Sequence, residues 1–307
     1  MTQIVLFGEC MLEGEQTSGL SFGGDTLNTA IYLRRTTDNT VHVSYATALG
    51  TDDDSQRLIN AWRQEQLDTQ LVTRISDKLP GRYHIIVDTL GERRFSYQRE
   101  NSAATAYFAK EKTPLESRLL QGEIDYLYLS GISLAILDDL AKNRLLDCVR
   151  QFKHQGGKVI FDNNYRPILW QTSHVLHYYQ QIMALTDIAL LTDEDEYLLY
   201  DEHAVEQIIE RTQQLQIPEV VIKQGKEPCI VITNSQRYSI ATENMADVVD
   251  TCAAGDAFAA GYLSRRLTGQ DVVEAAKFGH KLAAQVIQYP GAIIPKAAMT
   301  HLMTRRQ

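Results

Sequence analysis

The residues with the clearest chemical potential lie near the C-terminal end, where the sequence reads Asp-Thr-Cys-Ala-Ala-Gly-Asp over residues 250–256 and a helical pattern follows. Small residues at a helix start let backbone N–H groups approach an anion closely, and the helix dipole favours negative charge there. That field favours the ionised form of Asp256, which can then accept a proton from a hydroxyl. A simple N-cap is the alternative role for an isolated Asp at this place. An anion cradle beside a base predicts phosphoryl transfer to an alcohol.

Two arginines occupy positions that suit an anionic ligand, and a lysine ends a predicted strand. Arg99 follows Tyr97 by two residues in a strand-like segment, so both side chains are expected on one face. Arg166 comes after the apolar run 159–161, and Lys223 comes directly after another apolar run. A planar guanidinium suits a ligand carboxylate better than a neutral hydroxyl. The alternatives are a solvated surface cation for Arg99, a loop salt bridge for Arg166 and a plain turn after Lys223.

A double glycine near the N-terminus is the other candidate binding segment. Gly23 and Gly24 would let the backbone pass close to hydroxyl groups of a ligand, with Asp25 and Asn28 as directional partners. A tight turn before a helix that starts near Thr26 would explain the glycines, but it would not explain Asn28.

Short apolar runs alternate with amphipathic helical patterns along most of the chain. The runs typical of buried strands are residues 4–7, 43–49, 126–129, 159–161, 188–191 and 220–222. Apolar spacing predicts helices over residues 55–65, 134–154, 205–215, 255–267, 272–287 and near 296–303. This alternation predicts an α/β fold with a mostly parallel sheet, helices on both faces, and ligands at the carboxyl ends of the strands.

Residues 81–99 break this rhythm, because they alternate like two exposed antiparallel strands around a turn at 88–92. Together with residues 13–21 they predict a small inserted β-sheet. It is either a lid over a ligand or a surface hairpin, and Tyr83 on its first strand either contacts the ligand or packs within the sheet. Exposed strand edges can pair between protomers, so a homo-oligomer formed through the lid is a further expectation.

Composition narrows the class of protein. Thirty basic and 39 acidic residues give a net charge of −9, which argues against a nucleic-acid or anionic-membrane binder but not against a small anionic substrate. Four widely spaced cysteines without a CxxC pair disfavour a zinc or redox motif and favour reduced thiols. No apolar run approaches the roughly 20 residues of a spanning helix, and no basic segment precedes an N-terminal apolar run. A cytoplasmic protein is expected.

Five motifs, in order, resemble those of the ribokinase-like (phosphofructokinase-B) sugar kinases. Residues 250–256 resemble the family signature D-T-x-G-A-G-D, and residues 23–28 resemble its G-G-x-x-x-N motif. The predicted hairpin falls in the expected interval, residues 223–225 resemble the nucleotide-binding K-x-G turn, and residues 289–295 resemble the C-terminal G-A segment. Several other segments are similar to those of the family members that act on a sugar acid.

The resemblance implies a ribokinase-like kinase domain over residues 1–307, with a lid inserted at 13–21 and 80–101, and ATP-dependent phosphorylation of a sugar acid with Mg²⁺. Asp256 would be the general base, beside an anion hole formed by Ala253, Ala254 and Gly255. The substrate-binding residues it implies are Gly23, Gly24, Asp25, Asn28, Tyr83, Tyr97, Arg99 and Arg166. The nucleotide-binding residues it implies are Asn164, Lys223, Gly225, Ala253 and Gly255.

Two departures from the family pattern carry expectations of their own. Ala253 replaces the first glycine of the signature, and we expect its φ to stay negative so that its N–H still serves the anion hole. The N-x-x-E metal-associated motif is absent as written, which leaves Asp195 and Glu196, acting through water, as the candidates that orient magnesium. A P-loop kinase is excluded, because the chain has no G-x-x-x-x-G-K-[ST] sequence.

Two alternative functions remain open at this point. The first is a ribokinase-like kinase for another sugar such as fructose, although Arg99 and Arg166 speak against a neutral acceptor. The second is a non-catalytic sugar-acid sensor, in which Asp256 and its small-residue cradle would have no reason to be intact.

Overall fold

The computed structural model describes residues 1–14, 20–87, 93–109, 112–170, 174–233, 236–242 and 248–303. Its centre is a nine-stranded sheet with the order β13-β12-β11-β10-β9-β8-β1-β4-β5. Neighbours from β11 to β5 pair in parallel, whereas β12 and β13 add an antiparallel edge. The strands are β1 (Thr2–Phe7), β4 (Val41–Leu49), β5 (Val72–Arg74), β8 (Tyr126–Ser130), β9 (Lys158–Asp162), β10 (Ile188–Thr192), β11 (Glu219–Gln224), β12 (Glu227–Thr233) and β13 (Gln236–Ile240).

The alternation of side chains along the strands divides the interior into two hydrophobic cores. In β1, Ile4 and Leu6 pack in one core, while Val5 and Phe7 pack in the other. A sheet buried on both faces needs helices on both sides, which explains the alternating strand and helix patterns of the sequence. The six predicted strands and the mostly parallel sheet are confirmed.

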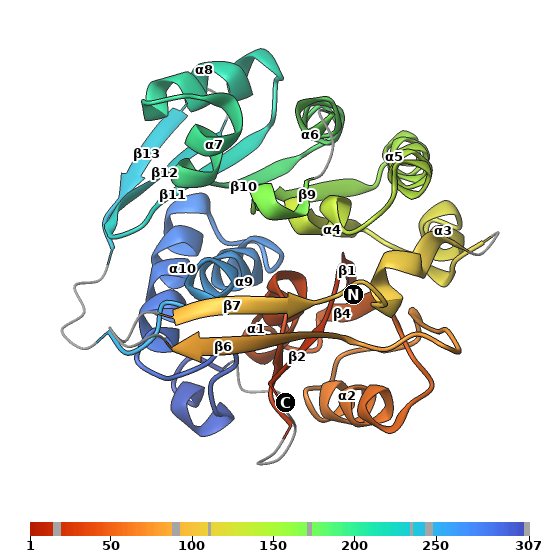
Figure 1. Ribbon diagram of the computed structural model, residues 1–307. Coiled ribbons are helices and arrows are strands. Elements are labelled where there is room, and N and C mark those ends of the chain that lie inside the picture. Colours follow the sequence, from red (N-terminus) through yellow and green to blue (C-terminus); the bar gives the residue numbers. More distant parts are fainter. Residues whose placement is uncertain are drawn as a thin grey trace.

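Each core is completed by its own set of helices, which Figure 1 shows around the sheet. The first set is α1 (Asp25–Thr36), α2 (Asp53–Gln64), α9 (Ala254–Arg266) and α10 (Val272–Val286). The second set is α3 (Pro114–Leu120), α4 (Gly131–Ala135), α5 (Asp139–His154), α6 (Val175–Met183), α7 (Asp193–Tyr200) and α8 (Val205–Gln214). Short 3₁₀ helices are η1 (Ala103–Ala109), η2 (Pro167–Leu169) and η3 (Lys296–Met299). None of the helices within the described ranges has both the length and the hydropathy that a membrane span needs.

A second, four-stranded sheet has the order β3-β2-β6-β7. Its long strands β6 and β7 cross the front of the molecule in Figure 1, apart from the large sheet. They pair antiparallel with Tyr83 opposite Tyr97, and β2 joins β6 in parallel. The predicted small sheet is confirmed, while the predicted turn at 88–92 and residues 15–19 lie outside the described residues. Its strands are β2 (Met11–Glu13), β3 (Phe22–Gly23), β6 (Gly81–Val87) and β7 (Arg93–Gln98).

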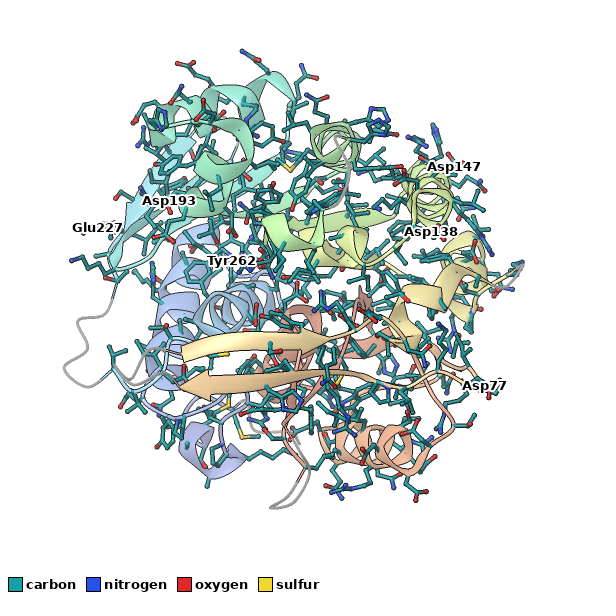
Figure 2. All side chains as sticks on the ribbon, viewed as in Figure 1. Asp77, Asp138, Asp147, Asp193, Glu227 and Tyr262 are labelled. Carbon is teal, nitrogen blue, oxygen red and sulfur yellow. The ribbon has the colours of Figure 1, made fainter. Side chains whose placement is uncertain are left out.

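Several elements differ from the sequence prediction, and β5, α3, α6 and α7 were not predicted. The single helix predicted over 134–154 is divided into α4 and α5, because the Asp138 carboxylate caps α5 by accepting from the N–H of Ala141 at 2.8 Å. Figure 2 labels Asp138 beside the start of α5. The helix predicted near 296–303 is only the 3₁₀ turn η3, which follows Pro295. The hairpin β12–β13 was not predicted.

Candidate active site

A cavity of about 840 Å³ lies where the carboxyl ends of the parallel strands face the small sheet. Asp162 ends β9 and Thr192 ends β10, and both line the cavity. Tyr83 and Tyr97 line it from β6 and β7. The structure brings together every predicted site residue in this one cavity, with two exceptions that are described below.

Asp256 lies in the first turn of α9 and is held by a side chain of α1. Nδ2 of Asn28 donates a hydrogen bond to Oδ2 of Asp256 at 2.8 Å. Enclosure by protein, followed by the nearby Asp25 carboxylate, raises the pKa of Asp256 to about 7, although Asn28 and Lys223 act in the opposite direction. A carboxyl group with a pKa near neutrality can accept and return a proton at physiological pH. The expectation that the helix field favours the ionised form is therefore not met, because burial and Asp25 outweigh that field. A pKa of about 7 nevertheless suits a general base.

Asp25 connects the start of α1 to the end of β9. Nδ2 of Asn164 donates to Oδ2 of Asp25 at 2.8 Å. Burial raises the pKa of the Asp25 carboxyl group, while the Ser130 hydroxyl and the Thr26 backbone lower it. Asn164 has the unusual φ of 26° for a residue with a side chain, and its N–H donates to Oδ1 of Asn163 at 2.8 Å. A residue expected to bind substrate and one expected to bind nucleotide are thus hydrogen-bonded to each other.

The backbone before α9 differs from the prediction at Ala253. This residue is left-handed, with φ 59° and ψ 15°, so the expectation of a negative φ is wrong. The chain turns sharply at Ala253, because α9 begins at the next residue. The segment before the turn is held by hydrogen bonds to the Asp250 carboxylate. Oδ1 of Asp250 accepts from the N–H of Cys252 at 3.0 Å, and Oδ2 accepts from the N–H of Gly291 at 3.0 Å. Adjacent left- and right-handed residues form a concave set of N–H groups, which favours an anion.

The N–H groups available in this cradle also differ from those expected. The N–H of Ala254, which was expected in the anion hole, donates to the carbonyl of Thr251 at 3.2 Å and is thus engaged within the loop. The first N–H groups of a helix have no acceptor within the helix. At α9 no side chain caps the helix, and within the described ranges the N–H groups of Ala253, Gly255 and Asp256 have no backbone acceptor, so they are available to an anion.

Arg99 follows β7 and lies beside the buried carboxylate of Glu9. Its Nη2 is 3.2 Å from Oε2 of Glu9 and donates to Sδ of Met11 at 3.0 Å. Its Cζ lies 5.1 Å from the centre of the Tyr97 ring, and both side chains line the cavity, as the alternation predicts. Nε and Nη1 of Arg99 have no hydrogen-bond partner among the residues that the structure describes. Buried donors require acceptors, and a ligand carboxylate would supply them.

Tyr83 contacts other residues of the small sheet through both its ring and its hydroxyl group. Its ring centre lies 6.5 Å from that of Tyr97, and its hydroxyl donates to Oε2 of Glu13 at 3.0 Å. Burial raises the pKa of this hydroxyl group. Tyr83 therefore packs within the sheet, and it also lines the cavity.

The double glycine permits a close approach between backbone segments. A Cβ on Gly24 would lie only 2.2 Å from the carbonyl oxygen of Glu9, and Gly24 has φ 152°. Gly23 is less constrained, since its Cβ would lie 3.3 Å from that of Ala292. The need for glycine at position 24 thus arises from packing against the loop after β1, and both glycines line the cavity.

Lys223 supplies a cation next to the helix cradle. Its Nζ donates to Oδ2 of Asp162 at 2.9 Å, and the hydroxyl of Tyr128 donates to the same oxygen at 3.3 Å. The same Nζ would be 3.7 Å from a Cβ on Gly255, which places it beside the start of α9. Gly225 is one of the two exceptions, because it lies in the turn between β11 and β12 at φ 57° and does not line the cavity.

Arg166 and Asp195 form an ion pair at the rim, with Nη1 of Arg166 donating to Oδ1 of Asp195 at 2.9 Å. The loop salt bridge considered for Arg166 is therefore present, and Arg166 also lines the cavity. Glu196 is the second exception, and its assignment as a magnesium-orienting acid is wrong. It is buried away from the cavity, where it accepts from Nδ2 of Asn163 at 2.9 Å and from Arg211.

Four polar residues that shape the site were not predicted from the sequence: Glu9, Glu13, Asp162 and Asn163. Asn163 is fully buried and links the ends of β9 and β10, since its Oδ1 accepts from the N–H of Thr192 at 3.0 Å. Asp162 ends a predicted strand, and Glu9 comes two residues after another. A search of all polar residues at strand ends would have found both.

Magnesium fits this site only as an ion carried by another ligand. In the described part of the chain, no three His, Cys, Asp or Glu side chains cluster in a way that would hold a metal. Mg²⁺ commonly keeps several waters and binds through one or two carboxylates together with phosphate groups. Asp195, which lines the cavity, is a carboxylate that fits such a role.

Comparisons with known proteins bear on the family of the chain and on its fold. Residues 1–299 match the sequence family described as pfkB family carbohydrate kinase. The chain is 46% identical to 2-dehydro-3-deoxygluconokinase of Escherichia coli (strain K12), over 97% of this chain and 98% of that protein. It is 45% identical to the Dickeya dadantii (strain 3937) protein of the same name, over 96% of this chain and 98% of that protein.

A solved structure supports the fold alone. Fructokinase from Xylella fastidiosa with bound ATP superposes with a TM-score of 0.81 at 20% sequence identity, over 98% of this chain and 97% of that chain. Because the family match spans nearly the whole sequence, the chain belongs to the pfkB family of carbohydrate kinases.

Proposed function

We propose that the protein transfers the γ-phosphoryl group of ATP to the 6-hydroxyl of 2-dehydro-3-deoxygluconate. The names of the two relatives described above, at 46% and 45% identity, support this substrate. The observation that carries the proposal is that Arg99 and Arg166 line the same cavity as Asp256. A neutral sugar needs hydrogen bonds only, whereas a sugar acid also needs cations at the end opposite the reacting hydroxyl.

At the acceptor end, Arg99 would bind the substrate carboxylate with the donors that the protein leaves unpaired. Arg166 is half exposed and paired with Asp195, so it can contact either the substrate or a phosphate group. Tyr97 would pack against the carbon chain of the substrate. Holding the acid end in this way places the far hydroxyl near Asp256, and positioning is a large part of phosphoryl-transfer catalysis.

At the reacting end, Asp256 would take the proton of the 6-hydroxyl as that oxygen attacks phosphorus. Asn28 orients the carboxylate through its 2.8 Å hydrogen bond to Oδ2. The N–H groups of Ala253, Gly255 and Asp256 and the dipole of α9 would stabilise negative charge on the transferring group. Lys223 would add a positive charge on the same side.

Mg²⁺, bound with ATP, would neutralise phosphate charge, as is general in phosphoryl transfer. Asp195 would hold it through water, and Asn164 would contact the nucleotide while bonded to Asp25. The strands β6 and β7 would serve as a lid that keeps water out of the cavity, which limits ATP hydrolysis.

A substrate panel tests the proposal. ADP release from purified protein is measured with ATP and Mg²⁺ over 2-dehydro-3-deoxygluconate, its C1-reduced neutral analogue, and fructose. We expect turnover with the sugar acid and kcat/KM at least about tenfold lower with the neutral analogue, since hydrogen bonds to charged groups contribute about 1.5–3 kcal/mol. The product should carry phosphorus on O6 by ³¹P–¹H correlation. Preferred turnover of fructose would support the alternative kinase, and binding of the acid without ADP release would support the sensor.

A further inference from the structure

Two buried glutamates that pair with arginines have different surroundings in this molecule. Glu116 binds Arg144 through both carboxylate oxygens, with N–O distances of 2.6 and 2.7 Å, and it also caps α3 by accepting from the N–H of Thr113 at 2.7 Å. Glu9 lies in the cavity wall with 2% of its surface exposed, and its Oε2 faces Arg99 at 3.2 Å. Apart from that ion pair, Oε2 of Glu9 has no hydrogen-bond partner in the described part of the chain.

The other carboxylate oxygen of Glu9 and its backbone are also held by neighbouring residues. The Ser102 hydroxyl donates to its Oε1. Ser102 is itself part of a tight turn with Arg99, since its N–H donates to the Arg99 carbonyl at 3.0 Å. The backbone carbonyl of Glu9 lies against Gly24. One carboxylate therefore fixes both the guanidinium and the turn that carries it.

Stability alone gives a poor reason for this buried carboxylate. Taking a charged pair out of water costs free energy that their attraction often fails to recover, so buried ion pairs are frequently replaceable by apolar residues. Glu116 offsets that cost with two oxygens on Arg144 and a helix cap. Oε2 of Glu9, by contrast, faces the guanidinium of Arg99 without a further partner among the described residues. A function for Glu9 in orienting Arg99 explains why the charge is kept.

The hydrogen-bond count on Arg99 shows what the orientation achieves. A guanidinium has five N–H donors in a fixed plane. Nη2 is used by Met11 and faces Glu9, while Nε and Nη1 retain three donors without a partner in the described residues. Fixing Nη2 therefore fixes the direction in which the remaining donors are presented to a ligand.

We propose that Glu9 is a positioning residue, which holds Arg99 so that its free donors bind the carboxylate of the sugar acid. This inference rests on the proposed function, because it assigns the group that recognises the acid end of that substrate. Glu9 acts through Arg99 and takes no part in proton transfer.

Glu9→Gln provides the test, because it keeps the shape of the side chain and removes the negative charge that faces Nη2 of Arg99. We expect KM for the sugar acid to rise about 10–100-fold, as for the loss of a well-oriented charged hydrogen bond. KM for ATP and kcat at saturation should stay close to those of the wild type. Ser102→Ala, which loosens Glu9 without removing it, should raise the same KM by a smaller factor.

The comparison with Arg99→Met separates positioning from direct contact. If Glu9 acts only through Arg99, adding Glu9→Gln to Arg99→Met gives no further rise in KM. An equal rise in both backgrounds would mean that Glu9 itself contacts the substrate and would overturn the inference. An unchanged or lower KM in Glu9→Gln alone would make Glu9 a mere counter-charge, which also overturns it.

Glu116→Gln is the matched control, since it alters a buried glutamate that pairs with an arginine outside the cavity. It should lower the melting temperature while leaving KM for the sugar acid unchanged. If the wild type fails to phosphorylate the sugar acid at all, the proposed function fails. If the wild type is active and Glu9→Gln is neutral, only the inference about Glu9 fails.

Discussion

Two sets of residues that line the cavity are built in different ways. The residues proposed to carry out the reaction are called the reacting end, and those proposed to bind the substrate carboxylate are called the acid-binding end. At the reacting end, Asp256, Asn28 and Lys223 project from α9, α1 and β11, which belong to the helices and the large sheet of the central fold. At the acid-binding end, Arg99 and Tyr97 belong to β7 and the residues after it, while Glu9 belongs to the loop after β1. One end is assembled within a single packed body, and the other joins two sheets through an ion pair.

This difference in construction leads us to expect different kinetic roles for the two sets of residues. Groups on packed helix and strand ends have fixed directions, which suits a base and an anion cradle that must not reorganise during reaction. Groups on the small sheet depend on cross-contacts such as Arg99–Glu9, so the acid-binding end can vary without disturbing the chemistry. Substitutions at the first end should reduce kcat, and substitutions at the second should mainly raise KM for the sugar.

Asp256→Asn should have the largest effect. Asn cannot accept the hydroxyl proton, so kcat should fall by about 10²–10⁴-fold, the range expected for loss of a general base. Steady-state assays measure kcat, and calorimetric titration with the sugar acid checks that binding persists. A variant with near-normal kcat would show that Asp256 is not the general base. It would also contradict the distinction between a reacting end that controls kcat and an acid-binding end that controls KM.

Arg99→Met should affect the opposite end. Loss of the guanidinium removes the donors for the substrate carboxylate, so KM for the sugar acid should rise about 10–100-fold. The neutral C1-reduced analogue should be affected much less, and the ratio of the two kcat/KM values is the measurement. A large fall in kcat with an unchanged KM would contradict the division described above.

Gly24→Ala should affect both ends, because Gly24 joins β3 of the small sheet to α1. The new Cβ would meet the carbonyl oxygen of Glu9 at 2.2 Å, so either the Glu9 loop or α1 must move. We expect a loss of about 1–3 kcal/mol in the free energy of unfolding, as for overpacking, measured by urea denaturation. KM and kcat should both change. Gly122→Ala is the control, since Gly122 has a positive φ but open space around it.

The smallest effects should appear in the pH profile. Because the pKa of Asp256 is raised to about 7, kcat/KM should fall tenfold per pH unit below that value, as the base becomes protonated. Asp25→Asn removes a charge that raises this pKa, so the fall of kcat/KM on the acidic side of the profile should move to lower pH. Asn28→Ala removes a hydrogen bond that lowers the pKa and should move this fall to higher pH. Opposite shifts would contradict the assignment of this fall to Asp256.

The same raised pKa also affects stability. The folded state holds the Asp256 proton more tightly than the unfolded chain, whose ordinary pKa is 3.8. This contribution to stability is fully present below pH 3.8 and is lost as the pH rises through about 7. Asp256→Asn should remove that part of the pH dependence of the unfolding free energy, which denaturation at several pH values measures.

The reacting end was largely predictable from sequence, because its residues follow local rules. Each of its signals is contained in a short stretch of sequence. These signals are small residues before a helix, an acid in the first turn of that helix, and a lysine at the end of a strand. The same locality explains why the strands of the large sheet were found, since each is a compact apolar run. The failures there were of conformation: Ala253 took the left-handed region, and Asp138 ended a helix pattern that continued past it.

The acid-binding end was predicted only in part. Alternation placed Arg99 with Tyr97, but no local pattern links Glu9 to a residue 90 positions away. Glu196 was misassigned for a similar reason, since its partner Arg211 lies on a separate helix and draws the carboxylate away from the cavity. Long-range ion pairs depend on how sheets and helices pack, and a single sequence does not show this.

The left-handed Ala253 has a consequence for how the loop behaves before any phosphate arrives. An L-residue in this region is strained by about 1–2 kcal/mol, which a glycine would avoid. Glycine, however, samples many more backbone conformations, and alanine confines the loop to few. The methyl group of Ala253 therefore restricts the backbone of this segment. The strain at Ala253 is the cost of a loop whose N–H groups are already oriented before a phosphate group binds.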